Sequence, residues 1–442
     1  MEMNQDKKLE RPVWITEKGQ VDEIFFCNAF QKKHHIIYTE GSFFGPEGRI
    51  SQEDDLRQMI YEELRPHIRS GAAARVESIL NTMSMEARQN CLDEDLSSML
   101  MTIPVANGNY QLDKGFSTMK HLTRYRLPVN YNPDAPKPEK WLKFLSELLH
   151  EEDIPTLQEY LGYCLIPSTH AQKMLIITGK GGEGKSRIGV VMKGLLGCNM
   201  KVGSVAKVEK SPFARADLQH CLLMVDDDLK MEALDQTNYL KSIITAEIPM
   251  DLEKKGIQSY QGQLYVRFLA FGNSSLQALH DRSYGFFRRQ IILQAKERPA
   301  DRKDDPFLSY SLLQELEGIL LWAIEGLERL HVQSFRFTQS RRARENLLDS
   351  MLRGNNVLEF LRSSGYIRFD PEATASSRVL YEAYRDWCSD NALNPLSCGS
   401  FWSFLGQNQQ TFHLTPSRSV PIGGGRYARG FKGISVISRL GI

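Results

Sequence analysis

Long hydrophobic runs and paired cysteines are both missing from this 442-residue sequence. No apolar stretch approaches the ~18 residues that a membrane-spanning helix needs. The first ten residues are polar and charged, unlike a signal peptide. The seven cysteines are an odd number without a C-x-x-C pair, which argues against disulfides and zinc sites and favours reduced thiols. We therefore expect a cytoplasmic protein with no membrane partner.

An excess of charge of one sign is missing as well, since the formal net charge is +1. A nucleic-acid partner would therefore have to be held by local basic patches and not by a basic surface as a whole. The sequence also lacks internal repeats and low-complexity tracts. Its 41% hydrophobic and 25% charged residues are typical of globular proteins. The length suits two or three domains, because domains cluster at roughly 100–150 residues.

Composition divides the chain into three predicted domains. Residues 1–140 mix apolar runs with charged helical stretches and close on a Pro-rich segment, 128–138, which we interpret as a linker. Residues 141–345 alternate strand and helix patterns and include a helical stretch over 308–330. This alternation predicts an α/β fold with a parallel sheet. Residues 346–442 hold two helical patterns and a basic, Gly-rich tail.

The clearest motif is GKGGEGKS at residues 179–186, which follows the apolar run 174–178 and precedes a helix-capable stretch. It matches G-x-x-x-x-G-K-[ST] in the strand–loop–helix setting that a phosphate-binding P-loop requires. The glycines let backbone N–H groups face phosphates, Lys185 supplies positive charge, and the Ser186 hydroxyl is suited to Mg²⁺. The alternative is a Gly-rich turn that matches by chance. We expect ATP and Mg²⁺ to bind here. The residues expected to contact the nucleotide are Gly179, Gly181, Gly182, Glu183, Gly184, Lys185, Ser186 and Arg187.

A second element lies about forty residues further on, where the apolar run 221–225 leads into three acids. We assign Asp226 to Mg²⁺ and Asp227 to the attacking water, since P-loop enzymes use carboxylates for both roles. Asp228 takes either role if the register is shifted by one residue. The alternative is a solvated acidic turn after a core strand.

Two further features indicate which kind of P-loop protein this is. Asn273 follows the strand-like run 266–272, where an amide would sense the γ-phosphate, although an Asn after a strand is more often a turn residue. Arg288 and Arg289 precede another apolar run, and arginines there can stabilise charge on a neighbouring subunit's nucleotide. A surface arginine pair is the alternative. An arginine acting in trans implies a heterologous interface, which closes into a ring.

Two basic segments are candidates for DNA contact. Lys254 and Lys255 lie in a stretch that contains glycines and has strand-like flanks, which favours a β-hairpin. Lysines at its tip would contact a DNA backbone. A solvated loop without a DNA role is an equally good interpretation. Near the C-terminus, two helical patterns precede a Gly-rich basic hairpin, the outline of a winged helix with its wing on duplex DNA. The wing residues that we expect to contact DNA are Arg426, Arg429 and Lys432. The aromatic residues of the preceding helix, Tyr381, Tyr384 and Trp387, are more often core than base-stacking platforms.

The order of these motifs resembles the superfamily 3 helicases, and among them the phage and plasmid satellite primase-helicase family related to the poxvirus primase-helicase. The likeness extends to the segments IPVANG at 103–108, LPVNYNPDA at 127–135, YLGY at 160–163, GFFRR at 285–289 and YRDWC at 384–388. It implies a pre-helicase domain over 1–140, an AAA+-like ATPase core over 141–345 and a C-terminal winged helix. It also implies a homo-hexamer that moves along single-stranded DNA during replication of a phage, plasmid or other mobile element, with Asn273 as sensor and the hairpin lysines on DNA.

The sequence departs from that family in three ways. Glu183 stands where the family commonly has Asn, which puts the nucleotide preference in doubt. Three consecutive aspartates leave the register of the water-activating acid open. No primase module is evident, so we expect a separate primase partner; the acid clusters at 53–55 and 93–95 are more typical of solvated helix faces than of polymerase metal sites.

We therefore predict an ATP-dependent DNA helicase. The main alternative is an origin-binding initiator or helicase loader in which ATP switches assembly without processive unwinding. A P-loop kinase acting on a small molecule is a third interpretation, against which the basic tail and the arginine pair argue.

Overall fold

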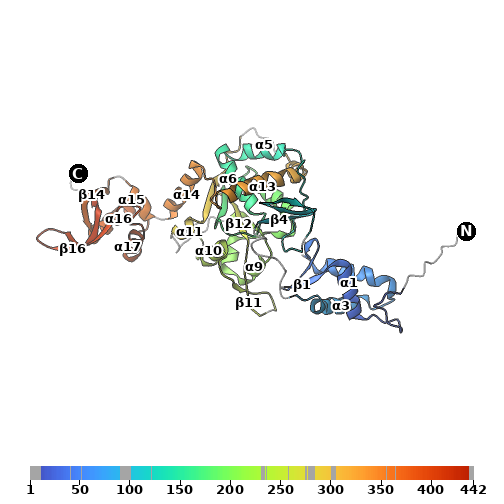
Figure 1. Ribbon diagram of the computed structural model, residues 1–442. Coiled ribbons are helices and arrows are strands. Elements are labelled where there is room, and N and C mark those ends of the chain that lie inside the picture. Colours follow the sequence, from blue (N-terminus) through green and yellow to red (C-terminus); the bar gives the residue numbers. More distant parts are fainter. Residues whose placement is uncertain are drawn as a thin grey trace. The chain divides into compact units, whose positions relative to one another are not determined.

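The computed structural model describes residues 11–39, 41–50, 52–89, 101–120, 122–229, 234, 236–256, 258–273, 276, 284–299, 305–354, 356–363 and 365–437 (Figure 1). The chain forms two compact units. The first consists of residues 1–231, 237–274 and 289–343, and the second of residues 232–236, 275–288 and 344–442. The three predicted domains stay a prediction.

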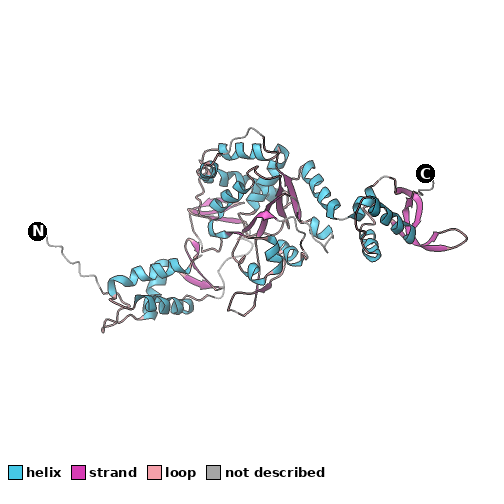
Figure 2. Cartoon of the chain, turned by 180° about the vertical axis from the view of Figure 1, so that it is seen from behind, coloured by secondary structure: helices cyan, strands magenta, loops and turns pink. Residues whose placement is uncertain are grey.

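A five-stranded sheet in the order β13-β7-β12-β9-β8 forms the centre of the first unit, and every pairing in it is parallel. Parallel strands that are covered on both faces are near-continuous apolar runs, and all six residues of β12 are buried. The predicted α/β fold with a parallel sheet is therefore confirmed (Figure 2). The strands are β7 (Met174–Thr178), β8 (Met200–Val202), β9 (Leu223–Leu229), β12 (Arg267–Gly272) and β13 (Gln290–Gln294).

Helices pack around this sheet, and α6 and α13 contact each other along their length. Gly162 of α6 and Gly326 of α13 permit it, because a Cβ at either position would collide with the backbone of the other helix. The helical stretch predicted over 308–330 is divided into two helices at Gln314 and Glu315. The helices of this region are α5 (Glu139–Leu148), η2 (Glu151–Asp153), α6 (Ile154–Tyr163), α7 (Ser186–Leu196), η3 (Gly197–Asn199), α8 (Val205–Lys210), α9 (Pro212–Ala216), α10 (Asn238–Thr245), α12 (Leu308–Leu313) and α13 (Leu316–Val332). The next helix, α14 (Arg341–Gly354), begins in this unit and continues into the second.

The N-terminal part has an apolar core of its own, formed by buried residues between Trp14 and Ala87. Its mixed character agrees with the sequence. The acids at 53–55 form the exposed first turn of a helix, as expected for a solvated face, whereas the acids at 93–95 lie outside the described residues. The elements are α1 (Glu23–His34), β1 (Ile37–Thr39), β2 (Ser42–Gly45), β3 (Gly48–Arg49), α2 (Glu53–Leu64), η1 (Arg65–His67) and α3 (Ala72–Glu86).

The Pro-rich segment 128–138, which we interpreted as a linker, is irregular as predicted. Tyr131 N–H donates to Asn107 Oδ1, and Asn107 Nδ2 donates to the Tyr131 carbonyl, both at 2.9 Å. Val129 belongs to the same buried cluster as the central sheet. The segment is therefore held by hydrogen bonds and apolar contacts. Three short strands precede it: β4 (Thr102–Val105), β5 (Gly108–Gln111) and β6 (Gly115–Ser117).

The second unit combines helices with an antiparallel sheet in the order β14-β16-β15. Tyr384 and Trp387 are buried, and Tyr384 stacks on Phe401 at a centroid distance of 4.7 Å, which confirms that these aromatic residues are core. The winged-helix assignment stays a prediction. The elements are α11 (Tyr284–Phe287), α15 (Asn356–Arg362), β14 (Ile367–Ser376), α16 (Ser377–Asp390), α17 (Cys398–Gln407), β15 (Thr415–Pro421) and β16 (Tyr427–Val436).

Within the described residues, none of the helices combines the length and the apolar character needed to cross a membrane.

Candidate functional site

The loop 179–185 connects the end of β7 to the start of α7, which confirms the strand and the helix predicted on either side of it. Gly181, Gly182 and Gly184 have φ values of 109°, 80° and 101°. Only glycine adopts such angles at little cost. The glycines thus allow the backbone turn that precedes α7.

A buried ion pair lies inside this loop. Lys185 Nζ is 2.7 Å from Glu183 Oε2, and the Gly181 N–H donates to Glu183 Oε1 at 2.9 Å. The residues Lys185 and Glu183 are only 8% and 3% exposed, respectively. Burial by itself raises the pKa of the Glu183 carboxyl, but the hydrogen bonds from Lys185 and from backbone N–H groups lower it overall. Glu183 is therefore a carboxylate at neutral pH.

The three aspartates lie within β9, which continues through them to Leu229 and does not end before them as the sequence suggested. Asp226 is buried, and its Oδ2 accepts a hydrogen bond of 2.7 Å from the Val205 N–H at the start of α8. Burial raises the pKa of the Asp226 carboxyl. Asp227 and Asp228 are exposed and line a cavity, whereas Asp226 is not among its lining residues. Asp227 and Asp228 therefore reach a cavity that Asp226 does not line, and the metal and water roles of the three acids stay predictions.

Asn273 directly follows β12, the strand that lies between β7 and β9. The Gly179 N–H donates to the Gly272 carbonyl at 3.0 Å, which joins the end of β12 to the start of the loop. Asn273 is exposed and lines the same cavity. Loop, acids and amide thus gather at the carboxyl edge of the parallel strands, where α/β sheets bind ligands.

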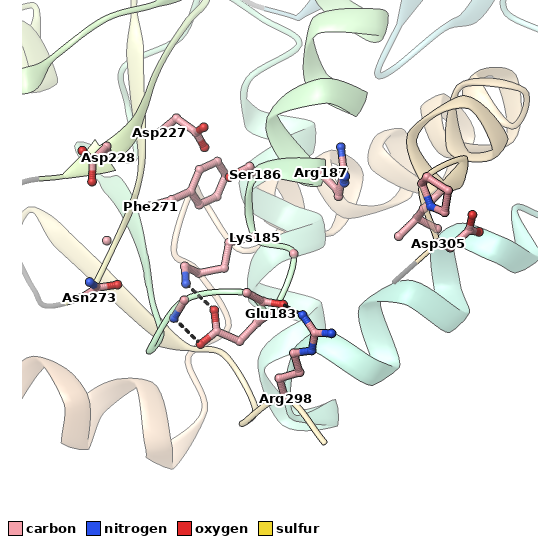
Figure 3. Close-up of a pocket in the computed structure, with 16 residues that line it drawn as sticks. Glu183, Lys185, Ser186, Arg187, Asp227, Asp228, Phe271, Asn273, Arg298 and Asp305 are labelled. Atoms are coloured by element: carbon pink, nitrogen blue, oxygen red, sulfur yellow. Dashed lines mark hydrogen bonds and ion pairs between the residues drawn. The ribbon is translucent and has the colours of Figure 1, made fainter. Parts of the chain in front are cut away.

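The cavity has a volume of about 800 Å³, which is within the range of small-molecule sites. In Figure 3, Asp227, Asp228 and Asn273 lie on one side of Lys185. Arg187 and Asp305 lie on its other side. Arg187 Nη1 donates to Ser309 Oγ at 2.8 Å, so α7 is linked to the start of α12. The lining residues that sequence reasoning missed are Phe271, Gly272, Arg298, Asp305, Pro306 and Leu308.

The order of the strands explains why sequence reasoning missed Arg298 among the lining residues. β13 is parallel to β7 and adjacent to it, so the chain that leaves β13 emerges at the edge where the loop 179–185 begins. Arg298 lies four residues after the end of β13, and its Nη1 is 3.5 Å from the Gly182 carbonyl. That adjacency depends on strand order, which is not visible in the sequence.

The arginine pair lies away from this cavity. The Met174 N–H donates to the Arg289 carbonyl at 2.8 Å, which puts Arg289 at the start of β7, whereas the loop begins at the end of that strand. Four residue steps in a strand span roughly 13 Å. Arg288 is exposed and Arg289 is half-buried. Neither lines the cavity of its own chain.

The predicted DNA-contacting lysines also lie outside the cavity. β10 (Met250–Leu252) and β11 (Tyr260–Gly262) form an antiparallel hairpin, which confirms that expectation. Lys254 is half-buried, with its Nζ 5.6 Å from the Tyr260 ring centroid, and Lys255 is exposed at the tip.

The predicted wing is also a hairpin, formed by β15 and β16. Three consecutive glycines with positive φ, at 423–425, lie in its turn. Arg426, Arg429 and Lys432 are exposed on it. The roles of both hairpins in DNA binding stay predictions.

Comparison with known proteins supports the fold. A family described as "Family of unknown function (DUF5906)" matches residues 177–289, which include the loop, the acids and Asn273. Two solved structures of the NrS-1 C-terminal region, both apo A forms, are similar to the chain with a TM-score of 0.51. Each is 13% identical and covers 89% of this chain, and the match spans 88% of the other chain. No curated protein sequence matches.

Proposed function

We propose that this chain is an ATP-dependent DNA helicase that assembles as a homo-hexameric ring and acts in the replication of a phage, plasmid or other mobile element. One observation carries the proposal. A P-loop with its lysine, two exposed carboxylates and an amide line a single cavity at the carboxyl edge of a parallel sheet. That combination suits phosphoryl transfer, because it offers cationic, acidic and amide groups around one bound phosphate chain.

The residues of the cavity suit a nucleotide with Mg²⁺. Backbone N–H groups of the glycine loop and the Lys185 ammonium are donors for phosphate oxygens. The Ser186 hydroxyl and the carboxylates of Asp227 and Asp228 are hard oxygen ligands, and Mg²⁺ in proteins usually takes only one or two carboxylates beside phosphate oxygens. When bound, Mg²⁺ neutralises negative charge on the phosphates.

In the proposed reaction the chain's own groups orient and activate water. Asp227 accepts the proton of the attacking water, and Asp228 takes part in holding the metal. Asn273 hydrogen-bonds to the γ-phosphate and to that water. Lys185 stabilises the charge that develops on the phosphate oxygens. An arginine of a neighbouring subunit, Arg289 or Arg288, completes the site in trans.

The experiment that tests this proposal measures ATP hydrolysis with and without single-stranded DNA and particle size with and without nucleotide. We expect DNA-stimulated hydrolysis, nucleotide-dependent rings, and loss of hydrolysis in Lys185→Ala. Normal turnover in Lys185→Ala would overturn the assignment of the loop. Because Lys185 balances the buried Glu183, thermal unfolding of the variant is measured in parallel.

An origin-binding initiator or helicase loader is the second candidate, favoured by the exposed basic hairpin at Arg426, Arg429 and Lys432, which suits duplex DNA. Strand displacement on a long forked duplex separates the two. A helicase unwinds it to the end, whereas a loader opens only short or origin-proximal DNA.

A further inference from the structure

An acidic side chain occupies the position in the loop where a phosphate ligand would find its donors. The Glu183 carboxylate accepts from the Lys185 ammonium at 2.7 Å and from the Gly181 N–H at 2.9 Å. An ammonium and a loop amide are the same two kinds of donor that a P-loop offers to a phosphate. Both side chains are almost fully buried, so the pair is not a solvated surface contact.

The backbone of the loop is built around this pair. A Cβ on Gly179 would lie 2.8 Å from both Glu183 Oε1 and Lys185 Nζ, so a larger residue there would displace the ends of these two side chains. Figure 3 shows the Glu183 and Lys185 side chains directed toward each other. The exposed pair of Lys180 and Glu297 nearby is different, because both of its side chains are more than three-quarters exposed. Glu183 is therefore bound inside the phosphate-binding loop (the cradle, residues 179–185), whereas Glu297 lies on the surface beside it.

We propose that the Glu183 carboxylate is a built-in competitor for the nucleotide phosphates: it holds Lys185 in the nucleotide-free loop and has to leave before a phosphate takes its place. The proposal rests on the proposed function, since it presumes that a nucleotide binds here. A carboxylate and a phosphate chain in contact with the same ammonium repel each other strongly, because little water separates charges in a buried site.

Two consequences follow from this competition. The pair neutralises Lys185 when no nucleotide is bound, which avoids an uncompensated buried charge. Each binding event must also break the pair, so nucleotide affinity is lower than the loop alone would give. Arg298, whose Nη1 lies 3.5 Å from the Gly182 carbonyl, offers a cation for the displaced carboxylate.

The test compares equilibrium binding of MgADP and of magnesium tripolyphosphate to the full chain by titration calorimetry. Glu183→Gln keeps the size of the side chain and removes its charge. We expect it to bind both ligands about tenfold more tightly than the wild type, a factor that corresponds to about 1.4 kcal/mol. The factor should be the same for both ligands, because the competition concerns phosphate and not the base.

Glu297→Gln is the matched control, since it removes an exposed acid beside the loop without touching the cradle. We expect less than a twofold change in that variant. Glu183→Asn, which carries a shorter amide, provides a second measurement if Glu183→Gln unfolds. Unchanged or weaker binding in the folded Glu183 variants, with measurable wild-type binding, would overturn the competitor role and make Glu183 a residue that only orders the loop. If neither the wild type nor any variant binds either ligand, the proposed function itself fails.

Discussion

Three consecutive aspartates on β9 share one chemistry but have different surroundings. Asp226 is buried and hydrogen-bonded to the start of α8, while Asp227 and Asp228 are exposed at the cavity. A carboxylate that activates water must be within hydrogen-bond reach of it. The three side chains are chemically identical, so their different positions decide which of them can reach a bound water.

We predict that Asp227→Asn binds ATP with nearly wild-type affinity but hydrolyses it about 10²–10⁴-fold more slowly, because an amide does not accept a proton as a carboxylate does. Single-turnover hydrolysis and equilibrium binding, measured separately, distinguish the two effects. If Asp228→Asn shows this phenotype and Asp227→Asn does not, the roles of the two residues are exchanged.

His220 makes stability depend on pH. Burial, followed by the charges of Arg49, Arg124 and Lys254, lowers its pKa to about 3, below the ordinary value of 6.5. The neutral ring is therefore the folded form. The stability that depends on it is complete above about pH 6.5 and is lost as the pH falls toward 3.

We predict that between pH 6.5 and 4.5 the wild type loses on the order of 2 kcal/mol more stability than His220→Asn. Asn does not ionise, and it tolerates the left-handed backbone at this position, where φ is 64°. Urea unfolding at several pH values measures the difference. Parallel pH profiles for the two proteins would contradict the prediction.

At the scale of elements, α6 packs against α13 and also contacts the central sheet. The Tyr160 hydroxyl of α6 donates to the Phe268 carbonyl of β12 at 2.7 Å, so the helix pair supports the strand that leads to Asn273. We predict that Gly326→Ala destabilises the protein by about 2 kcal/mol or more, because its Cβ would meet the Gln158 backbone. Urea midpoints measure this.

Gly189→Ala on α7 is the matched control for Gly326→Ala. Its Cβ would lie 3.5 Å from Phe271 and Val225, an ordinary contact. Alanine has a higher helix propensity than glycine by about 1 kcal/mol. We therefore expect Gly189→Ala to be neutral or stabilising. Equal effects of the two substitutions would show that the close approach of the two helices is not limiting.

The hairpin of β15 and β16 leads to a prediction about DNA. Substituting Arg426, Arg429 and Lys432 together by alanine should weaken duplex binding and lower the slope of log affinity against log salt by about one for each phosphate that the variant no longer neutralises. Arg378→Ala is the control, because Arg378 is paired with Glu382 at 2.8 Å. Fluorescence anisotropy over a salt series measures both. An unchanged slope in the triple variant would exclude these three residues from the duplex interface.

At the scale of the whole molecule, the proposed ring predicts that subunits complement one another. Arg289 lies at the opposite end of β7 from the loop of its own chain. Arg289→Ala and Lys185→Ala should each be inactive alone, while mixed rings contain interfaces in which both residues are intact. Since an arginine in trans is worth about 10³ or more in rate, partial recovery of ATP hydrolysis should be easy to measure.

The same mixing experiment with Arg288→Ala identifies which arginine acts. Mass spectrometry of the mixtures verifies that mixed rings form. No recovery for either arginine variant under those conditions would mean that the pair acts within its own subunit or only maintains the fold.

The elements that depend on local patterns could be predicted from the sequence. The strand of β7, the loop and α7 follow from an apolar run, a set of glycines and a helix-capable stretch, and the hairpin around Lys254 follows from its strand-like flanks. These features depend on neighbouring residues, so the sequence contains what is needed to predict them.

Which of these elements meet depends on how the chain packs in three dimensions. The order of strands brings β12 between β7 and β9 and so joins Asn273 to the loop and the acids, and it brings Arg298 to the outer side of the loop. The burial of Asp226 against α8 and the pairing of Glu183 with Lys185 also depend on how side chains pack. Strand order and packing depend on contacts between residues far apart in the chain. The periodicity of apolar residues reports only on local structure, so it does not predict these contacts.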